Sequence, residues 1–216
     1  IDGTMVQRLA AERPQTSRPR TRFAYYPGLS TLPNGAVPPT FNRPHSIEAD
    51  VNIPKGGAEG VLICTGGAAG GYSMYVKDGL LHYTLNYVAK EYMTVSSTEP
   101  VPEGDHKLRF EFEPTGKKDL SKGLGAPGRF QLYIDGKLVG NLDVPYTTPN
   151  FYELEGLSCG YDSGAAAAGD AYQAPFKFTG TAREVVIDIS GEVIEEDEET
   201  RRAAQDATMR RLMAQQ

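Results

Sequence analysis

Apolar and polar positions alternate along most of this chain. The clearest case is 45–53, where Ile47, Ala49, Val51 and Ile53 alternate with polar residues. A period of two sends successive side chains to opposite faces, so this segment predicts a strand with one buried face. The same alternation, or a short run of apolar residues such as 61–64, predicts further strands. These lie at 22–26, 61–64, 72–77, 81–87, 91–97, 105–113, 128–134, 137–143, 156–161 and 176–190.

Turn residues separate these segments. Asp78-Gly79 and Asp135-Gly136 are dipeptides suited to a type I′ hairpin, because both central residues must take positive φ. The glycine-rich run TGGAAGG, residues 65–71, interrupts the first strands of the meander. The Pro-rich segment 27–44 predicts a long surface loop, which we expect to be held by Leu32, Val37 and Phe41.

About ten strands without βαβ alternation predict an all-β fold. We expect an antiparallel β-sandwich of jelly-roll or concanavalin-like type over residues 22–190. Residues 1–21 predict a connector with a short helix at Thr4–Glu12. Residues 191–216 predict a charged helical tail, since the acidic run 195–199 precedes arginines at i,i+4 spacing.

Charge and composition narrow the function. The formal net charge is −6 and no Lys/Arg cluster alternates with aromatics, which disfavours a nucleic-acid partner. No apolar run approaches the roughly 18 residues of a membrane span. The chain starts at Ile1 without a secretory signal, which we interpret as a segment of a longer or processed protein. The compartment is therefore unknown from the sequence.

Cysteines and histidines offer little chemistry. Cys64 and Cys159 lie in apolar surroundings and are expected to be small buried hydrophobic residues, with a disulfide between them as the alternative. The three histidines, His45, His82 and His106, lie on different predicted strands without a carboxylate or Cys at ligand spacing. We expect solvent-facing histidines and no metal site.

The glycine-rich loop is the first candidate binding site. The backbone N–H groups of Gly66, Gly67, Gly70 and Gly71, next to Tyr72, could cradle a sulfate or a sugar. The alternative is that these glycines allow a tight strand reversal or close backbone packing. No helix N-terminus follows, as a phosphate loop would require, which favours the alternative.

Carboxylates provide two further candidates. Glu48 and Asp50 share one strand face and could form a glycosidase pair, although Asn52 follows where a further carboxylate would be needed. The alternative, a solvated outer face, is the interpretation that we favour. Residues 162–173 predict a small-residue loop with no core of its own. Asp162 and Asp170 flank this loop and could hold Ca²⁺, or could cap turns.

Aromatic residues could stack on a sugar. The chain has 12 Tyr, 8 Phe and no Trp. Tyr75, Tyr133 and Tyr161 are the candidate platforms, and core packing is the default alternative.

Two long segments carry a family resemblance. NRPHSIEADVNIPKGGAEGVLICTGGAAGGYSMYVKDGLLHYTLNYV and GYDSGAAAAGDAYQAPFKFTGTAREVVIDIS resemble the C-terminal β-sandwich domain of the large bacterial arylsulfatases. The glycine spacings and Asp-Gly turns come in the same order, and the likeness covers roughly Phe23 to Ser190.

The resemblance implies a non-catalytic domain of a sulfuric ester hydrolase. Its partner would be a sulfatase catalytic domain of the same parent chain, on which it would pack. The loops 66–71 and 162–173 would then form a wall of the cleft for a sulfated or sugar substrate. The parent would use formylglycine and a divalent cation, Ca²⁺ or Mg²⁺. Neither Cys64 nor Cys159 lies in the formylglycine motif, so this chain carries no catalytic residue and no cofactor of its own. The alternative function is a free-standing carbohydrate-binding module.

Overall fold

The structure, a computed structural model, describes residues 20–149, 155–162 and 164–192. The expected helix at 4–12 and the expected tail from 193 lie outside the described residues. The strands are β1 Arg22–Tyr25, β2 His45–Ile53, β3 Gly60–Gly67, β4 Gly70–Lys77, β5 Leu80–Tyr87, β6 Glu91–Pro100, β7 Gly104–Pro114, β8 Gly128–Ile134, β9 Lys137–Val144, β10 Leu157–Cys159 and β11 Thr181–Asp188. Two short 3-10 helices, η1 Asn34–Ala36 and η2 Gly169–Ala171, complete the described elements.

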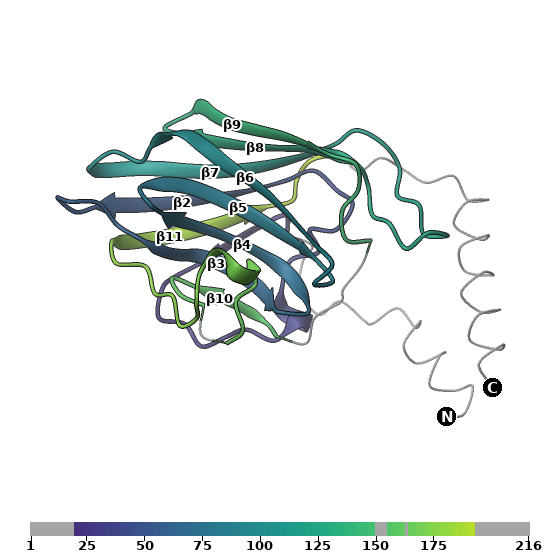
Figure 1. Ribbon diagram of the computed structural model, residues 1–216, viewed down its shortest axis with the longest axis horizontal. Coiled ribbons are helices and arrows are strands. Elements are labelled where there is room, and N and C mark those ends of the chain that lie inside the picture. Colours follow the sequence, from purple (N-terminus) through teal and green to yellow (C-terminus); the bar gives the residue numbers. More distant parts are fainter. Residues whose placement is uncertain (1–19, 150–154, 163, 193–216) are drawn as a thin grey trace.

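These strands form two antiparallel sheets stacked face to face (Figure 1). The six-stranded sheet has the order β1-β11-β2-β7-β8-β9, and the five-stranded sheet has the order β10-β3-β4-β5-β6. The predicted antiparallel sandwich is therefore confirmed. The two Asp-Gly turns are also where the pattern placed them, with Asp78 and Asp135 both at φ 50°.

The alternation in the sequence produces one apolar layer between the sheets. Ile47, Phe110, Leu132 and Ile187 face inward from the six-stranded sheet and are fully buried. The five-stranded sheet contributes residues such as Met74, Leu81 and Tyr83. The Tyr83 ring stacks on Phe110 with centroids 3.5 Å apart, so aromatic contacts join the two sheets at the centre of the core.

The two long sides of the sandwich are closed in different ways. On one side β6 and β9 meet, and Thr98 Oγ1 donates a hydrogen bond to the Val139 carbonyl at 2.9 Å. On the other side Leu32 of the Pro-rich loop exchanges two backbone hydrogen bonds with Leu157 of β10. Leu32 and Val37 pack against the core, as expected, but Phe41, the third expected anchor of this loop, is exposed to solvent.

The outer face of the five-stranded sheet carries a second apolar cluster. Residues 166–176, the covering segment, cross this face (Figure 1). Ala167, Ala168 and Tyr172 of this segment bury Val61 and Tyr75 beneath them. The sequence pattern gave this segment no core of its own, and that expectation is wrong. Small alanine side chains let the backbone approach the sheet closely, so a segment with few large apolar residues still covers it.

The two cysteines are free. They lie on neighbouring strands, where Cys159 is opposite Ile63 and Cys64 is opposite Ser158. Cys159 belongs to the inner core and Cys64 to the outer cluster, so the pleat sends their side chains to opposite faces and a bridge is sterically impossible. Burial raises the pKa of the Cys159 thiol to about 12, which keeps it protonated.

Replacing Gly71 with alanine should cost more than about 3 kcal/mol of unfolding free energy. Gly71 has φ +135°, and an added Cβ would lie 2.0 Å from the Thr65 carbonyl oxygen. Gly136→Ala is the matched control, because Gly136 also has positive φ but has open space around it; it should cost only about 1 kcal/mol. Urea denaturation measures both, and equal losses would contradict the steric argument.

Candidate functional site

A groove of about 470 Å³ crosses the outer face of the six-stranded sheet. Its floor is a row of four side chains in register on adjacent strands: Asp188, Ser46, Glu111 and Gln131. Their sequence neighbours Ile187, Ile47, Phe110 and Leu132 are buried in the core, so the alternation turns this row to the solvent. Neighbouring strands are about 4.8 Å apart, and the row therefore extends over roughly 14 Å.

The groove lies towards the end of the sheet where β2 begins and where β7 and β11 end. Pro44 and Gly191 form one end, where an added Cβ on Gly191 would lie 2.5 Å from the Pro44 ring. Glu113 of β7 lines the groove at this same end, because the register pairs His45 with Phe112. The lining is a mixture of carboxylate, amide, hydroxyl and ring atoms on rigid strands, so the groove presents fixed hydrogen-bonding groups.

The neighbouring row of the same face holds Glu111 in place. Arg109 Nη1 lies 3.0 Å from Glu111 Oε1. The Arg109 guanidinium also lies over the Tyr133 ring, 4.4 Å from its centroid. This stack fixes the arginine, and the arginine orients the carboxylate at the groove floor. Of the three tyrosines considered as sugar platforms, Tyr133 is the one beside this groove.

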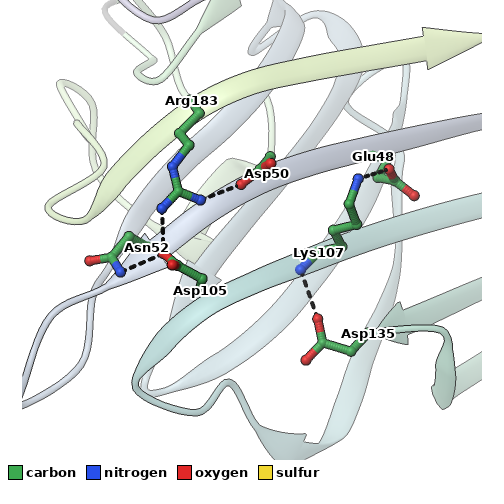
Figure 2. A network of polar contacts seen from close by, with 7 residues as sticks. All are labelled: Glu48, Asp50, Asn52, Asp105, Lys107, Asp135 and Arg183. Atoms are coloured by element: carbon green, nitrogen blue, oxygen red, sulfur yellow. Dashed lines mark hydrogen bonds and ion pairs between the residues drawn. The ribbon is translucent and has the colours of Figure 1, made fainter.

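Farther along the same face, the carboxylates are held in a network of ion pairs (Figure 2). Lys107 Nζ donates to Glu48 at 2.9 Å, and the Lys107 backbone N–H donates to Asp135. Arg183 bridges Asp50, at 2.6 Å, and Asp105. Each carboxylate of the supposed glycosidase pair is thus bound to its own cation. This arrangement favours the solvated-face interpretation over an acid–base pair.

The glycine-rich loop folds as the β3–β4 hairpin. The Gly66 N–H donates to the Gly156 carbonyl at 3.2 Å, and Gly67 is paired with Gly70 in the ladder. An added Cβ on Gly67 would lie 2.8 Å from the Glu155 carboxylate. The loop is therefore bordered by a negative charge, which is unfavourable for sulfate. A binding role for Gly66, Gly67, Gly70 and Gly71 stays a prediction.

Tyr72 and Asp162, the other two predicted binding residues, are buried and apart from the groove. The Tyr72 ring packs on Tyr83 between the sheets, with centroids 5.7 Å apart. Asp162 is 2% exposed and accepts hydrogen bonds from Tyr172 Oη at 2.8 Å and from the Ala167 N–H at 3.2 Å. These bonds cap the covering segment, as the turn-capping alternative predicted.

The other two tyrosine candidates are also engaged in packing. Tyr75 stacks on His82 and meets Tyr172 edge-on beneath the covering segment. Tyr161 Oη donates to the Leu29 carbonyl at 3.3 Å. Both tyrosines are therefore engaged in contacts within the protein, away from the groove.

His45 departs most from expectation, because it does not face the solvent. Its ring packs beside Phe110 and Phe112, with centroids 5.8 and 5.6 Å away. Nδ1 donates to the Arg43 carbonyl at 3.0 Å, which places the proton on Nδ1. Burial lowers the His45 pKa to about 4. The ring closes the core beneath the groove as a neutral group. Residue 45 shares the strand face of Ile47, because the two positions are two apart in the alternating segment. This signal in the sequence could have placed His45 on the inward face.

Within the described ranges, no group of three His, Cys, Asp or Glu side chains could hold a metal ion. No helix in the same ranges has the length and hydropathy needed to cross a membrane.

Comparisons with known proteins concern the fold alone. No protein-family model and no curated protein matches the chain. Among solved structures, the CBM40 domain of the Ruminococcus gnavus IT-sialidase bound to alpha2,3 sialyllactose is 13% identical with a TM-score of 0.49, over 74% of this chain and 83% of that one. The leech intramolecular trans-sialidase is 13% identical with a TM-score of 0.49, over 76% and 23% of the two chains. Domains LG4-5 of the mouse laminin alpha1 chain are 15% identical with a TM-score of 0.49, over 78% and 42%.

Acidification should destabilise the fold through His45. Its folded pKa of about 4 lies below its ordinary value of 6.5, so between these values the unfolded chain binds a proton that the folded chain does not. The unfolding free energy should therefore fall as the pH drops from 7 towards 4, by up to about 3 kcal/mol from this group. Urea titrations at pH 7 and 4.5 measure the loss. His45→Gln should show a loss smaller by about 2 kcal/mol, and an identical pH dependence would refute the assignment.

Proposed function

We propose that this chain is a non-catalytic carbohydrate-binding β-sandwich module whose ligand lies in the groove of the six-stranded sheet. The observation that carries the proposal is the row Ser46–Glu111–Gln131, in register on three adjacent strands within a groove of about 470 Å³. Ligand sites of small molecules typically have volumes of about 300–1,000 Å³.

The chemistry of the row suits a polyhydroxylated ligand. A carboxylate accepts hydrogen bonds, an amide both donates and accepts, and a serine hydroxyl does either. Sugar hydroxyls are donors and acceptors as well, so this set can pair with adjacent hydroxyls of one ring. The strands hold the side chains in place before binding, which reduces the entropy lost on association. Tyr133, next to the row, adds an aromatic surface beside the groove.

We also propose, as a second candidate, that the module belongs to a larger arylsulfatase-type enzyme and packs on its catalytic domain. The support is the sequence resemblance, together with the positions of the resembling residues. They form β2 to β5, the covering segment and β11, so the quoted motifs are ones that build the sandwich. Gly71 and Asp162 are two of these residues. Gly71 allows the backbone to approach Thr65 closely in the β3–β4 hairpin, and Asp162 accepts a hydrogen bond from Tyr172 Oη. The two proposals are compatible, because accessory modules can bind sugars.

The full chain should bind an oligosaccharide with a dissociation constant of millimolar or tighter. Glu111→Gln and Gln131→Ala should each weaken binding about tenfold, since each removes hydrogen bonds worth about 1.5 kcal/mol to the ligand. Isothermal titration calorimetry after a glycan-array screen provides the measurement. Glu184→Gln, on the same sheet face outside the groove, is the control and should bind normally. A chain that binds no glycan, or groove variants that bind like the control, would disprove the proposal.

The isolated chain should not hydrolyse aryl sulfates, because it has no formylglycine motif. Release of a chromogenic phenol from its sulfate ester, with an active sulfatase as the positive control, is the assay. Hydrolysis of the aryl sulfate faster than in buffer alone would disprove the accessory-domain proposal. The mass of the native polypeptide in its source cell is a second check, since the proposal requires a product much larger than 23.5 kDa.

A further inference from the structure

Three buried polar atoms without a hydrogen-bond partner in the protein belong to residues around one small cavity. In the described ranges, six buried side-chain atoms lack such a partner: Tyr25 Oη, Arg43 Nε, His45 Nε2, Thr65 Oγ1, Tyr72 Oη and Thr148 Oγ1. Of these residues, His45, Tyr72 and Thr148 line a cavity of about 30 Å³ between the two sheets. Leaving a buried polar atom unpaired is costly, and native proteins rarely do so. The cavity is therefore a candidate binding site.

The cavity lies at the end of the sandwich where β2 and β4 begin and where β5 and β7 end. Three aromatic rings and one leucine from the core form much of its wall: Tyr83, Leu85, Phe112 and Phe130. The loops at 40–42 and 147–148 complete the lining together with His45 and Tyr72. His45 and Phe112 also line the groove, so the cavity and the groove share part of a wall.

Size and polarity together select the occupant. The volume of the cavity is close to the roughly 30 Å³ that one molecule occupies in liquid water. An ion would lose its hydration among the rings of Tyr83, Phe112 and Phe130, which is strongly unfavourable. An apolar occupant would leave the three polar atoms unpaired. A neutral hydrogen-bonding molecule of the size of water satisfies both conditions.

We infer that this cavity binds one ordered water molecule through His45, Tyr72 and Thr148. His45 Nδ1 donates to the Arg43 carbonyl, so Nε2 carries a lone pair and accepts a hydrogen bond. The Tyr72 hydroxyl can donate, and the Thr148 hydroxyl can donate or accept. One water can therefore donate to His45, accept from Tyr72 and pair with Thr148, which gives it the usual three hydrogen bonds of a buried water.

The water also has a consequence for the groove. Because His45 lines both spaces, a hydrogen bond to its Nε2 holds a ring that belongs to the groove wall. The backbone carbonyl of Arg43 holds the other nitrogen of the same ring. The inference does not depend on which ligand the groove binds.

Magnetic relaxation dispersion of the water oxygen counts the water molecules that stay buried in the full chain. The double variant Tyr72→Phe, Thr148→Val should hold one long-lived water fewer than the unmodified chain, because two of the three hydrogen bonds are lost. A high-resolution crystal structure of the unmodified chain should show the water within hydrogen-bonding distance of all three atoms, about 2.7–3.2 Å.

Stability provides a second readout, and its sign depends on the water. Tyr72→Phe and Thr148→Val each remove one hydroxyl with little change of shape. With the water bound, each change should lower the folding equilibrium constant about fivefold, as expected for a lost hydrogen bond. Without it, each change should raise that constant, because an unpaired buried hydroxyl is removed. Urea denaturation measures both variants.

Thr84→Val is the matched control. Thr84 is also fully buried, but its hydroxyl pairs with Thr94 Oγ1 at 2.8 Å, on the outer side of the five-stranded sheet. This variant should lose stability and keep the same number of buried waters. An unchanged water count in the double variant, a crystal structure without water at the three atoms, or single variants more stable than the unmodified chain would each overturn the inference. If the double variant does not fold, the crystal structure of the unmodified chain decides.

Discussion

The fixed register between β2, β7 and β8 is the constraint on which the rest of this molecule depends. It places Ile47, Phe110 and Leu132 side by side on the inner face, where they form the apolar layer that holds the two sheets together. Because successive side chains point to opposite faces, the same register aligns the polar row of the groove on the outer face. A slip by one residue would destroy the core and the groove at once.

The two outer faces of the sandwich use their polar residues differently. On the five-stranded sheet they are enclosed: beneath the covering segment, Tyr172 Oη donates to Asp162 and accepts a hydrogen bond from the Ser73 hydroxyl, so these polar atoms are satisfied internally. On the six-stranded sheet they remain in solvent and pair through charges such as Lys107–Glu48. Exposed ion pairs of this kind add little stability, which leaves this face free to serve recognition.

The residues of the proposed sugar-binding groove and those of the two quoted arylsulfatase-like segments overlap only in part. The resemblance follows residues that shape the sandwich, including Gly71 at the hairpin and Asp162, which accepts hydrogen bonds from the covering segment. Of the four side chains on the groove floor, Ser46 and Asp188 fall in the two quoted segments, whereas Glu111 and Gln131 do not. A shared scaffold therefore does not specify the ligand, because recognition depends on side chains that the fold tolerates but does not require.

The sequence by itself determined the fold class, the strands and their inward residues, because a period of two and Asp-Gly turns are local signals. The alternation over 45–53 and 105–113 by itself turns Ser46 and Glu111 outward. Only the tertiary structure decided that they share a row with Gln131, since strand order and register arise from contacts between distant segments. The same holds for the covering segment, whose alanines gain burial only from the sheet beneath, and for His45, whose low pKa comes from Phe110 and Phe112 packed around it.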